Sequence, residues 1–546
     1  MIYRKIALPL FLSLISLTSF ADKYPRNYSI DIIHYSFELT LSDNTDEIIG
    51  RTTISLQFKT TDVKQLRFDL ANKTDKRIGK GMVVESVMFN NMPLEFTHEN
   101  DALFIKLGKG MEKDRLYSFV VSYRGIPADG LRIGATRYGD RSFFNENWPN
   151  RTRHWLPTVD HPYDKATSEF IVTAPAHYKV VSNGLLMEES IINKEQKLTH
   201  WKQSVPVSSW LFVLGVCDFA VQYVDQFEGK SIQTWVYSKD REAGFYDFAS
   251  PTKQVLEFYS AYAGPFAYEK MASIQTPSVN GGMETSSAIF YGEDLVNGKR
   301  DTRLRNVVIH ELAHQWFGNA VTESTWDDAW LSEGFATYFT LLFQEYAYGH
   351  DEYTDGLKKS RKTILDFYKK DSSFTIVGDR TAELGPVTNN MTYQKGAWTL
   401  HMLREKMGQE NFKKGIQAYY RKYFNANATT DNLMEEMQAF CKENLQSFFD
   451  QWLRRADVLK IRGSWEYDST AKQVIINIEQ TQSSGFLFDV PVEFQLIDNA
   501  GKPGQLVKFN LNTKTAQFKM SAAQKPVAVL IDPRTVLLGD YFFPPL

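Results

Sequence analysis

The segment from His310 to Glu333 constrains this chain more than any other; it reads HELAHQWFGNAVTESTWDDAWLSE. His310 and His314 are four residues apart, so a helix would place them one turn apart on the same face. The predicted helix is apolar on nearly every side, which is typical of a buried helix; its apolar residues are Val307, Val308, Ile309, Leu312, Ala313, Trp316 and Phe317. Unpartnered polar groups in a core cost about 2–7 kcal/mol each, so these histidines need a partner.

A zinc ion would be that partner. Catalytic zinc takes three protein ligands and keeps one position open. His310 and His314 would supply two ligands, and Glu333, in a second apolar run WLSEGFA, is the candidate for the third. Glu311 would take a proton from a bound water. The alternative is a surface helix, because HExxH arises by chance in roughly 1 of 100 such chains. The apolar surroundings favour the metal site, and we expect one Zn²⁺ ion per chain.

Residues 1–21 have the pattern of a secretory signal peptide. Arg4 and Lys5 precede an apolar run over residues 6–17, and the segment ends on the small-x-small sequence Ser19-Phe20-Ala21. The alternative is an uncleaved membrane anchor, which the shortness of the apolar run disfavours. We expect an exported protein, periplasmic or secreted, with no stable membrane insertion of the mature chain.

The charge balance argues against two classes of partner. The formal net charge is −3, and residues 1–21 hold two basic and no acidic side chains. The mature chain would therefore carry about −5. No polybasic run is present that would bind nucleic acid or an anionic membrane surface. We expect neither as a partner.

At 546 residues the chain is too long for a single core. Apolar and polar residues alternate as in strands through the first part, the middle has helical periodicity from Asp351 to Ala456, and strand-like alternation returns after Asp457. We predict a multidomain α+β fold. Its parts are a signal peptide at 1–21, an N-terminal β-sheet or saddle domain at 22–225, a catalytic domain rich in helix at 226–456, and a small C-terminal β-sandwich at 457–546.

Two further segments offer polar groups to the metal site. Gly281, Gly282, Met283 and Glu284 form GGME, in which paired glycines allow close approach to a ligand and the glutamate would bind a cationic group. The alternative is a bulge and turn with a solvated glutamate. Tyr393 precedes a helix predicted to start near residue 396. Its phenol either points into a cleft, or the ring packs against the protein with its hydroxyl group in water.

An irregular loop interrupts the predicted N-terminal β domain at residues 143–162 and reads FFNENWPNRTRHWLPTVDHP. Its prolines, tryptophans and alternating charges do not fit a regular strand. Loops of this kind on a rigid scaffold often line a site. The alternative is a structural loop that caps the sheet.

Together these motifs resemble the zinc aminopeptidases of the gluzincin type, the family of aminopeptidase N and leukotriene-A hydrolase. The resemblance rests on the order and spacing of GGME at 281–284, HELAHQWFGN at 310–319, WLSEGFA at 330–336, YQKG at 393–396 and FFDQWL at 448–453. It implies a thermolysin-like zinc peptidase domain over residues 226–456. It also implies peptides with a free N-terminus as substrates.

The resemblance assigns the groups around the metal. His310, His314 and Glu333 bind zinc, Glu311 is the general base, and Tyr393 stabilises the oxyanion. Zinc lowers the pKa of a bound water to about 7 and polarises the scissile carbonyl. A phenol donor at the oxyanion contributes about 10²–10³ in rate.

The resemblance also assigns the residues that bind the substrate's N-terminus. This sequence departs from the family pattern here in two places. Glu284 binds the α-amino group, Gly281 and Gly282 hold the substrate backbone, and Met283 is a further substrate-binding residue. The asparagine that usually follows this glutamate is Thr285 here. The glutamine or glutamate motif of the family's amino-terminal domain is not intact, and Glu146 in the FNENWP loop is the candidate second amine anchor. Apart from the resemblance, the candidates to orient the metal ligands are Asn319 and either Asp327 or Asp328.

Two other functions remain open at this point. An endopeptidase of the thermolysin type shares the two zinc helices, but its cleft has no use for an amine anchor such as Glu284. A peptide-binding scaffold without catalysis is disfavoured by the complete set of candidate catalytic groups. Side-chain preference and oligomeric state have no signal in the sequence.

Overall fold

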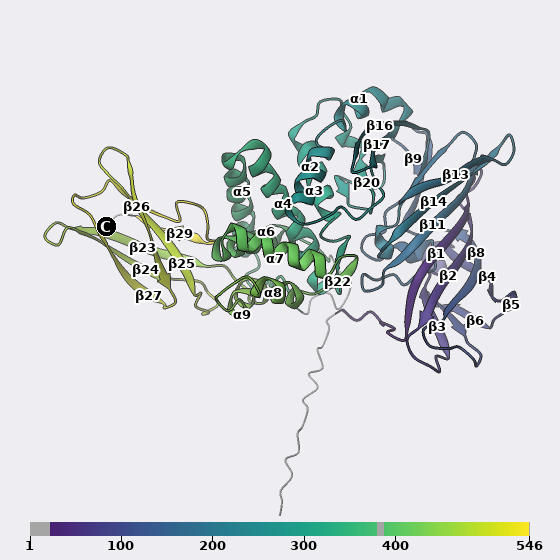
Figure 1. Cartoon of the computed structure of the whole chain (residues 1–546), viewed down its shortest axis with the longest axis horizontal. Helices are drawn as coiled ribbons and strands as arrows, with labels where there is room; N and C mark the ends of the chain where they lie inside the picture. Colours follow the sequence, from purple (N-terminus) through teal and green to yellow (C-terminus); the bar gives the residue numbers. More distant parts are fainter. Residues whose placement is uncertain (1–21, 379–386, 545–546) are drawn as a thin grey trace, which may run out of the picture.

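The computed structural model describes residues 22–378 and 387–544. The molecule is elongated, with a β-rich N-terminal part at one end, helices in the middle and a small β part at the other end (Figure 1). This arrangement confirms the predicted multidomain α+β fold class. The predicted signal peptide, residues 1–21, lies outside the described residues. Within the described ranges, no helix is both long enough and apolar enough to cross a membrane.

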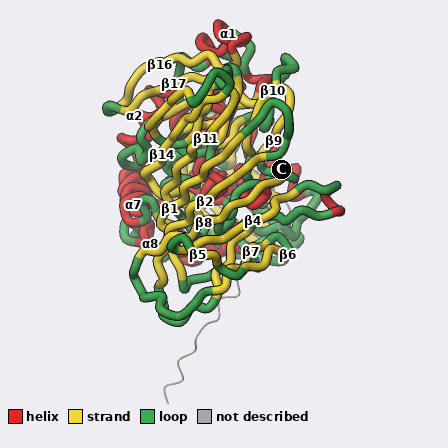
Figure 2. Tube along the Cα trace, turned by 90° about the vertical axis from the view of Figure 1, so that its right-hand side faces the viewer, coloured by secondary structure: helices red, strands yellow, loops and turns green. Residues whose placement is uncertain are grey.

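The N-terminal part is built on one large sheet. Figure 2 looks at the molecule from this end and shows the strands of the sheet side by side. Strands β1 (Ile30–Thr40) and β11 (Ala166–Pro175) pair in parallel, and the other neighbours are antiparallel. Tyr35, Phe37 and Leu39 alternate with more exposed residues along β1, as expected for a sheet with one face on a core. The spatial order is β13 (Leu185–Ile191), β14 (Gln196–Val207), β11 (Ala166–Pro175), β1 (Ile30–Thr40), β2 (Ile48–Phe58), β8 (Leu116–Ile126), β4 (Gly81–Phe89) and β5 (Met92–Pro93).

Two smaller sheets complete this part. One has the order β12 (Lys179–Ser182), β15 (Leu214–Cys217), β10 (Arg141–Asn145) and β9 (Leu131–Ala135). The other has the order β3 (Gln65–Asp69), β7 (Ala102–Lys106) and β6 (Phe96–Glu99). The irregular loop predicted from residue 143 therefore begins inside strand β10 and leaves it after Asn145.

A five-stranded sheet begins the central part. Its order is β16 (Phe219–Phe227), β17 (Lys230–Tyr237), β18 (Lys270–Thr276), β20 (Ala288–Gly292) and β19 (Gly282–Met283). The domain boundary predicted between residues 225 and 226 falls inside β16, which pairs with β17. Every residue of β18 and β20 is buried, as expected for strands covered on both faces. The short edge strand β19 lies against α3 (Thr302–His314) and carries part of the GGME motif.

Helices fill the rest of the central part. The first two helices of this part are separated by Pro251, which directly precedes the second of them. Besides α3, the helices are α1 (Arg241–Asp247), α2 (Thr252–Tyr262), α4 (Trp330–Tyr348), α5 (His350–Tyr368), α6 (Asn390–Met407), α7 (Gln409–Lys422), α8 (Thr430–Gln438) and α9 (Gln446–Phe449). A small parallel pair joins β21 (Val321–Glu323) to β22 (Ala426–Ala428).

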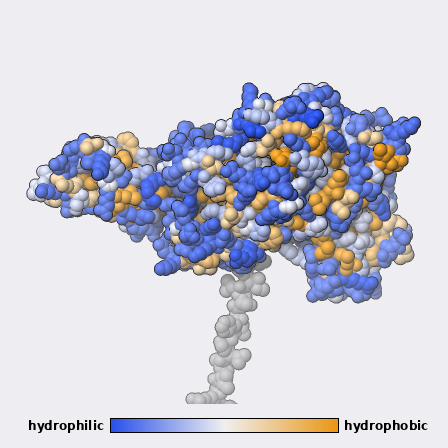
Figure 3. Space-filling view, turned by 45° about the horizontal axis from the view of Figure 1, so that its top comes forward, coloured by the Kyte–Doolittle hydropathy of each residue, from blue (hydrophilic) through white to orange (hydrophobic). Residues whose placement is uncertain are grey.

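The C-terminal part is a β-sandwich, as predicted. Aromatic side chains pack between its sheets; the rings of Phe509 and Phe518 are stacked with centroids 4.5 Å apart. One sheet has the order β27 (Thr515–Ser521), β24 (Gln473–Gln480), β23 (Lys460–Asp468) and β29 (Asp540–Phe542), and the other β26 (Pro503–Leu511), β25 (Val490–Ile497) and β28 (Ala528–Ile531). On the face drawn in Figure 3 the surface is largely hydrophilic, with hydrophobic residues in separate groups.

Candidate metal centre and active site

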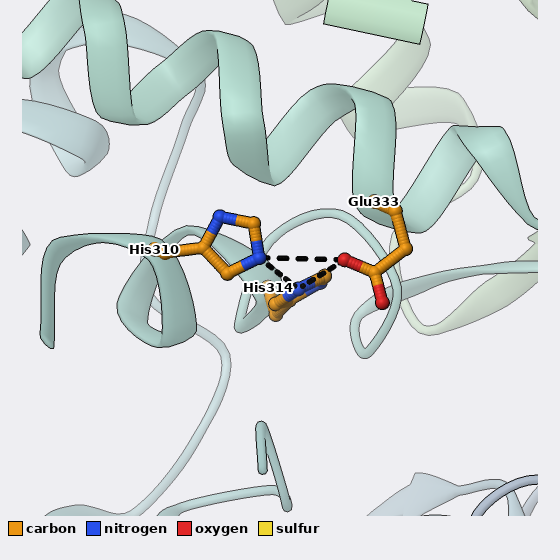
Figure 4. Close-up of side chains that lie close together, drawn as sticks. All are labelled: His310, His314 and Glu333. Atoms are coloured by element: carbon orange, nitrogen blue, oxygen red, sulfur yellow. Dashed lines mark hydrogen bonds and ion pairs between the residues drawn. The ribbon is translucent and has the colours of Figure 1, made fainter. Parts of the chain in front are cut away.

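Two packed helices carry the three candidate zinc ligands. His310 and His314 lie on α3, whose first turn is capped by Asp301 through a 2.9 Å bond from the Leu304 amide. Glu333 lies in the first turn of α4. Figure 4 shows the three side chains converging on one point from these two helices.

The distances between the ligand atoms fit a tetrahedral metal. Nε2 of His310 and Nε2 of His314 are 3.2 Å apart, and each lies 3.3 Å from Oε2 of Glu333. Zinc bonds of about 2.0–2.1 Å in tetrahedral geometry place neighbouring ligand atoms about 3.3 Å apart. The described residues therefore hold a triangle of donors with the dimensions of one face of a zinc coordination sphere.

Two neighbouring oxygen atoms fix the second ring nitrogen of His314. Its Nδ1 lies 3.2 Å from the carbonyl oxygen of Phe317 and 3.0 Å from Oγ of Ser332. A donor proton on Nδ1 leaves the lone pair of Nε2 free for a metal. Gly318 makes this contact possible: it has a φ of 113°, and a Cβ there would lie 3.1 Å from Nδ1.

The site concentrates negative charge in a buried place. Burial opposes ionisation of Glu333, but the charges and hydrogen bonds of His314 and His310 outweigh it and hold its pKa at about 2. Burial would lower the pKa of His314, and the carboxylates of Glu284, Glu333 and Glu311 instead raise it to about 10. Three carboxylates around one point favour a cation there, and a metal ion would take the place of the proton.

Glu311 lies on the same helix, under the edge strand β19. Only 6% of the residue is exposed, and this burial raises its pKa well above the usual range, with the charge of Glu284 acting in the same direction. A Cβ on Gly282 would overlap the Glu311 carboxylate. Only glycine lets the backbone of β19 come this close to the candidate base.

Glu284 directly follows β19 and reaches the same place. One ligand atom each of Glu284, Glu311 and His314 lies within 4.8 Å of the others. The backbone carbonyl of Glu284 accepts bonds from Nδ2 of Asn319 at 2.6 Å and Nε2 of Gln315 at 3.1 Å. Among the described residues, no side chain donates a hydrogen bond to its carboxylate. The bulge-and-turn alternative with a solvated Glu284 is therefore wrong: the carboxyl group is buried beside Glu311.

Thr285 and Asp328 have structural contacts of their own. The hydroxyl of Thr285 donates to the carbonyl of Ala288, so it closes the turn after the motif. Asp328, a candidate to orient the ligands, accepts bonds from the backbone and hydroxyl of Thr430 instead. Asn319, another of the orienting candidates, contacts Glu284 directly through the hydrogen bond to its carbonyl.

Tyr393 lies beside the candidate metal ligands. Helix α6 starts at Asn390 with a capping box between Asn389 and Thr392, so the helix start predicted near residue 396 is wrong and Tyr393 belongs to the first turn. Its hydroxyl donates a 2.6 Å hydrogen bond to Oε1 of Glu333. Burial first, and then the charge of Glu333, raise the pKa of Tyr393 well above its usual range, so the phenol keeps its proton.

The structure places Glu146 in another environment. Its carboxylate forms an ion pair with Arg151 and accepts a 2.9 Å bond from the amide of Trp148. It lines a cavity of about 330 Å³ together with Arg132 and Ser278. No described contact joins it to Glu284 or to the histidines. Gly282 and Met283, in contrast, directly precede Glu284, and the backbone of Gly282 lies against the Glu311 carboxylate.

The sequence profiles of one peptidase family match two long segments of the chain. The profile of the peptidase M1 N-terminal domain matches residues 32–211, and that of the peptidase family M1 domain matches residues 247–452. Together the two segments span more than half of the sequence. The chain belongs to peptidase family M1.

Several aminopeptidases are similar in sequence to this M1 chain over much of its length. Glutamyl aminopeptidase of Mus musculus is 28% identical over 506 residues, which cover 86% of this chain and 52% of the relative. Aminopeptidase M1 of Arabidopsis thaliana is 29% identical over 372 residues, which cover 64% of this chain and 40% of the relative. The chain thus spans about half or less of the length of these curated relatives.

Solved structures show the same fold. The M1 zinc metallopeptidase of Deinococcus radiodurans has a TM-score of 0.66 and 23% identity, covering 78% of this chain and 94% of that one. A mutant of that protein, bound to a Tyr-Ser-Ala substrate, has the same TM-score, identity and coverage.

Two residues that shape this M1 site were not predicted from the sequence. Gln315 donates to the carbonyl of Glu284 and accepts a 3.0 Å bond from the amide of Ser287. A buried glutamine directly after a ligand histidine was the available signal, because such an amide needs partners. Gly334 packs on Gly396, where a Cβ would meet the facing Cα at 2.9 Å. This close approach of α4 and α6 brings Tyr393 to Glu333, and nothing in the sequence shows it.

Proposed function

We propose that this M1 protein is a zinc-dependent aminopeptidase that removes N-terminal residues from peptides. The proposal rests on the position of Glu284. Its buried carboxylate lies within 4.8 Å of Glu311 and His314, measured between ligand atoms, and it accepts no hydrogen bond from a side chain of the described residues. A substrate ammonium group would supply such hydrogen bonds together with a positive charge.

The chain's own residues then perform the reaction in a fixed arrangement. His310, His314 and Glu333 would hold one zinc ion, which when bound polarises the scissile carbonyl and activates a water. Glu311 accepts a proton from the attacking water and returns it to the leaving amine. Tyr393 donates its phenolic proton in a hydrogen bond to the oxygen of the tetrahedral intermediate.

Selectivity for the first peptide bond follows from the anchor. The ammonium group pairs with Glu284, and residues Gly281–Met283 hold the backbone beside it. A peptide with its amine bound there presents only its first carbonyl to Glu311, because the distance between anchor and base is set by the fold. An endopeptidase needs no such carboxylate.

Matched substrates test the proposal. Amino-acid arylamides with a free amine should be cleaved, and their Nα-acetylated counterparts should be cleaved at least about 100-fold more slowly. A chelator should stop both reactions, and added zinc should restore them. Equal cleavage of free and acetylated substrates would favour the endopeptidase, and no cleavage of either by zinc-loaded protein would favour the binding scaffold.

We also propose export, on the pattern of charged, apolar and small residues in 1–21. The mature protein should begin at Asp22 and accumulate outside the cytoplasm. Mass spectrometry of the protein from each cell fraction measures this. Full-length protein that retains residues 1–21 in the membrane fraction would show an uncleaved anchor instead.

A further inference from the structure

Lys165 reaches from the N-terminal β domain into the catalytic domain. It directly precedes β11, and its Nζ donates to the carbonyl oxygens of Asn319 and Ala320, each at 2.9 Å, and of Ala426 at 3.3 Å. All three partners are acceptors, which matches the three protons of an ammonium group. The lysine thus holds the turn that follows the zinc helix.

Asn319 connects this lysine to the candidate amine anchor. Its backbone amide donates to the carbonyl of His314 at 3.1 Å, which ties it to the end of the zinc helix. Its own carbonyl binds Lys165, while its side-chain Nδ2 donates to the carbonyl of Glu284 at 2.6 Å. Asn319 is fully buried. One residue therefore joins the N-terminal domain, the zinc helix and the GGME segment.

A buried carboxyl group lies in the same region as the lysine. Glu323, on β21, is 1% exposed, and neither of its carboxylate oxygens has a hydrogen-bond partner within the described ranges. Its charge opposes the effect of burial on the pKa of Lys165. Burial lowers the pKa of Lys165 to about 7 and raises that of Glu323 to about 8, so the three hydrogen bonds, and not an ion pair, hold the lysine at this domain contact.

We propose that Lys165 and Asn319 are positioning residues that set Glu284 at its distance from the zinc ligands. The N-terminal domain thereby determines which peptide bond is presented, although it supplies no group that reacts. This inference rests on the proposed aminopeptidase function. A lysine with a purely structural role would affect zinc binding, turnover and amine binding alike.

A matched pair of ligands separates the two roles. An amino-acid hydroxamate offers a zinc-binding group and a free amine, and its Nα-acetyl derivative offers the same zinc-binding group with the amine blocked. The ratio of their dissociation constants, measured by calorimetry on zinc-loaded protein, reports the contribution of the amine anchor. Lys165→Met and Asn319→Ser are the test variants. Lys179→Met is the control, because Lys179 also donates to a backbone carbonyl, that of Phe219, but leads to no site residue.

The expected result is selective. Lys165→Met should lower the ratio about tenfold, because misplacing a binding group by about 1 Å is costly, while the acetylated ligand and the zinc content stay within about twofold of wild type. Asn319→Ser should do the same, and the double variant should add little, since both act through one chain of bonds. Lys179→Met should leave the ratio unchanged.

Two outcomes would overturn the inference: an unchanged ratio in both test variants, or equal weakening of both ligands. If Lys165→Met does not fold, Asn319→Ser alone carries the same measurement. Failure of the proposed function would look different, because wild-type protein would then bind both hydroxamates equally well.

Discussion

Oη of Tyr393 lies 2.6 Å from Oε1 of Glu333, while Oε2 of the same carboxylate faces both ligand histidines at 3.3 Å. One carboxylate therefore joins the candidate oxyanion donor to the candidate metal ligands. The close contact of Gly334 with Gly396 holds the two helices at the distance that this bond requires.

Tyr393→Phe should separate catalysis from metal binding. Removing the hydroxyl takes away the oxyanion donor and leaves Oε2 of Glu333 in place, so kcat should fall about 10²–10³-fold with zinc content unchanged. Steady-state kinetics on an arylamide, together with elemental analysis, measure both. Activity close to that of wild type would remove Tyr393 from the mechanism.

Gly282→Ala should disturb the general base. The added methyl group overlaps the Glu311 carboxylate, so either the base or strand β19 must move. We expect kcat/KM to fall at least about tenfold, because small misplacements of reacting groups are costly. Gly134→Ala is the control, since a Cβ there meets no atom closer than 3.9 Å. A Gly282→Ala enzyme as active as this control would show that the close approach of β19 to Glu311 does not matter for the base.

Metal removal should reduce stability as well as activity. A ligand that binds only the folded state adds RT ln(1 + [L]/Kd), and without it Glu333, Glu311 and Glu284 lose their countercharge. The Tm measured with chelator should lie below that measured with zinc. Glu311→Gln should keep the zinc-dependent rise in Tm and lose turnover. A Tm that does not respond to zinc would argue against the metal centre.

Asp164 should make stability depend on pH. Burial raises the pKa of Asp164 to about 8, and the charge of Asp31 acts in the same direction. An unfolded aspartate has a pKa near 3.9, so between about pH 4 and pH 8 the folded chain keeps a proton that the unfolded chain has lost. Stability therefore falls as pH rises through this window.

Asp164→Asn removes this titration. Its Tm should exceed that of wild type at pH 8, and the difference should shrink towards pH 5. Thermal unfolding at several pH values gives the comparison, with Asp75→Asn, at an exposed position, as the control. Parallel pH profiles for wild type and Asp164→Asn would show that the carboxyl group is ionised in the fold.

The chemistry of the metal centre could be predicted because it is local in the sequence. A four-residue spacing puts His310 and His314 on one face of any helix, and the apolar residues around them require that helix to be buried. The motif around Glu333 and the glycines before Glu284 are also short segments, and each indicated a site residue without reference to distant parts of the chain. The three-part fold also followed from periodicity, since strand and helix patterns change along the chain.

The tertiary structure decided how these pieces are held. The pairing of Glu146 with Arg151, the start of α6 at Asn390 and the reach of Lys165 to Asn319 all depend on contacts that periodicity does not encode. Side-chain partners and element ends are set by competition among segments far apart in the chain, with energies of about 1 kcal/mol each. For this reason the residue types of the site were visible in the sequence, and the distance between Glu284 and the metal ligands was not.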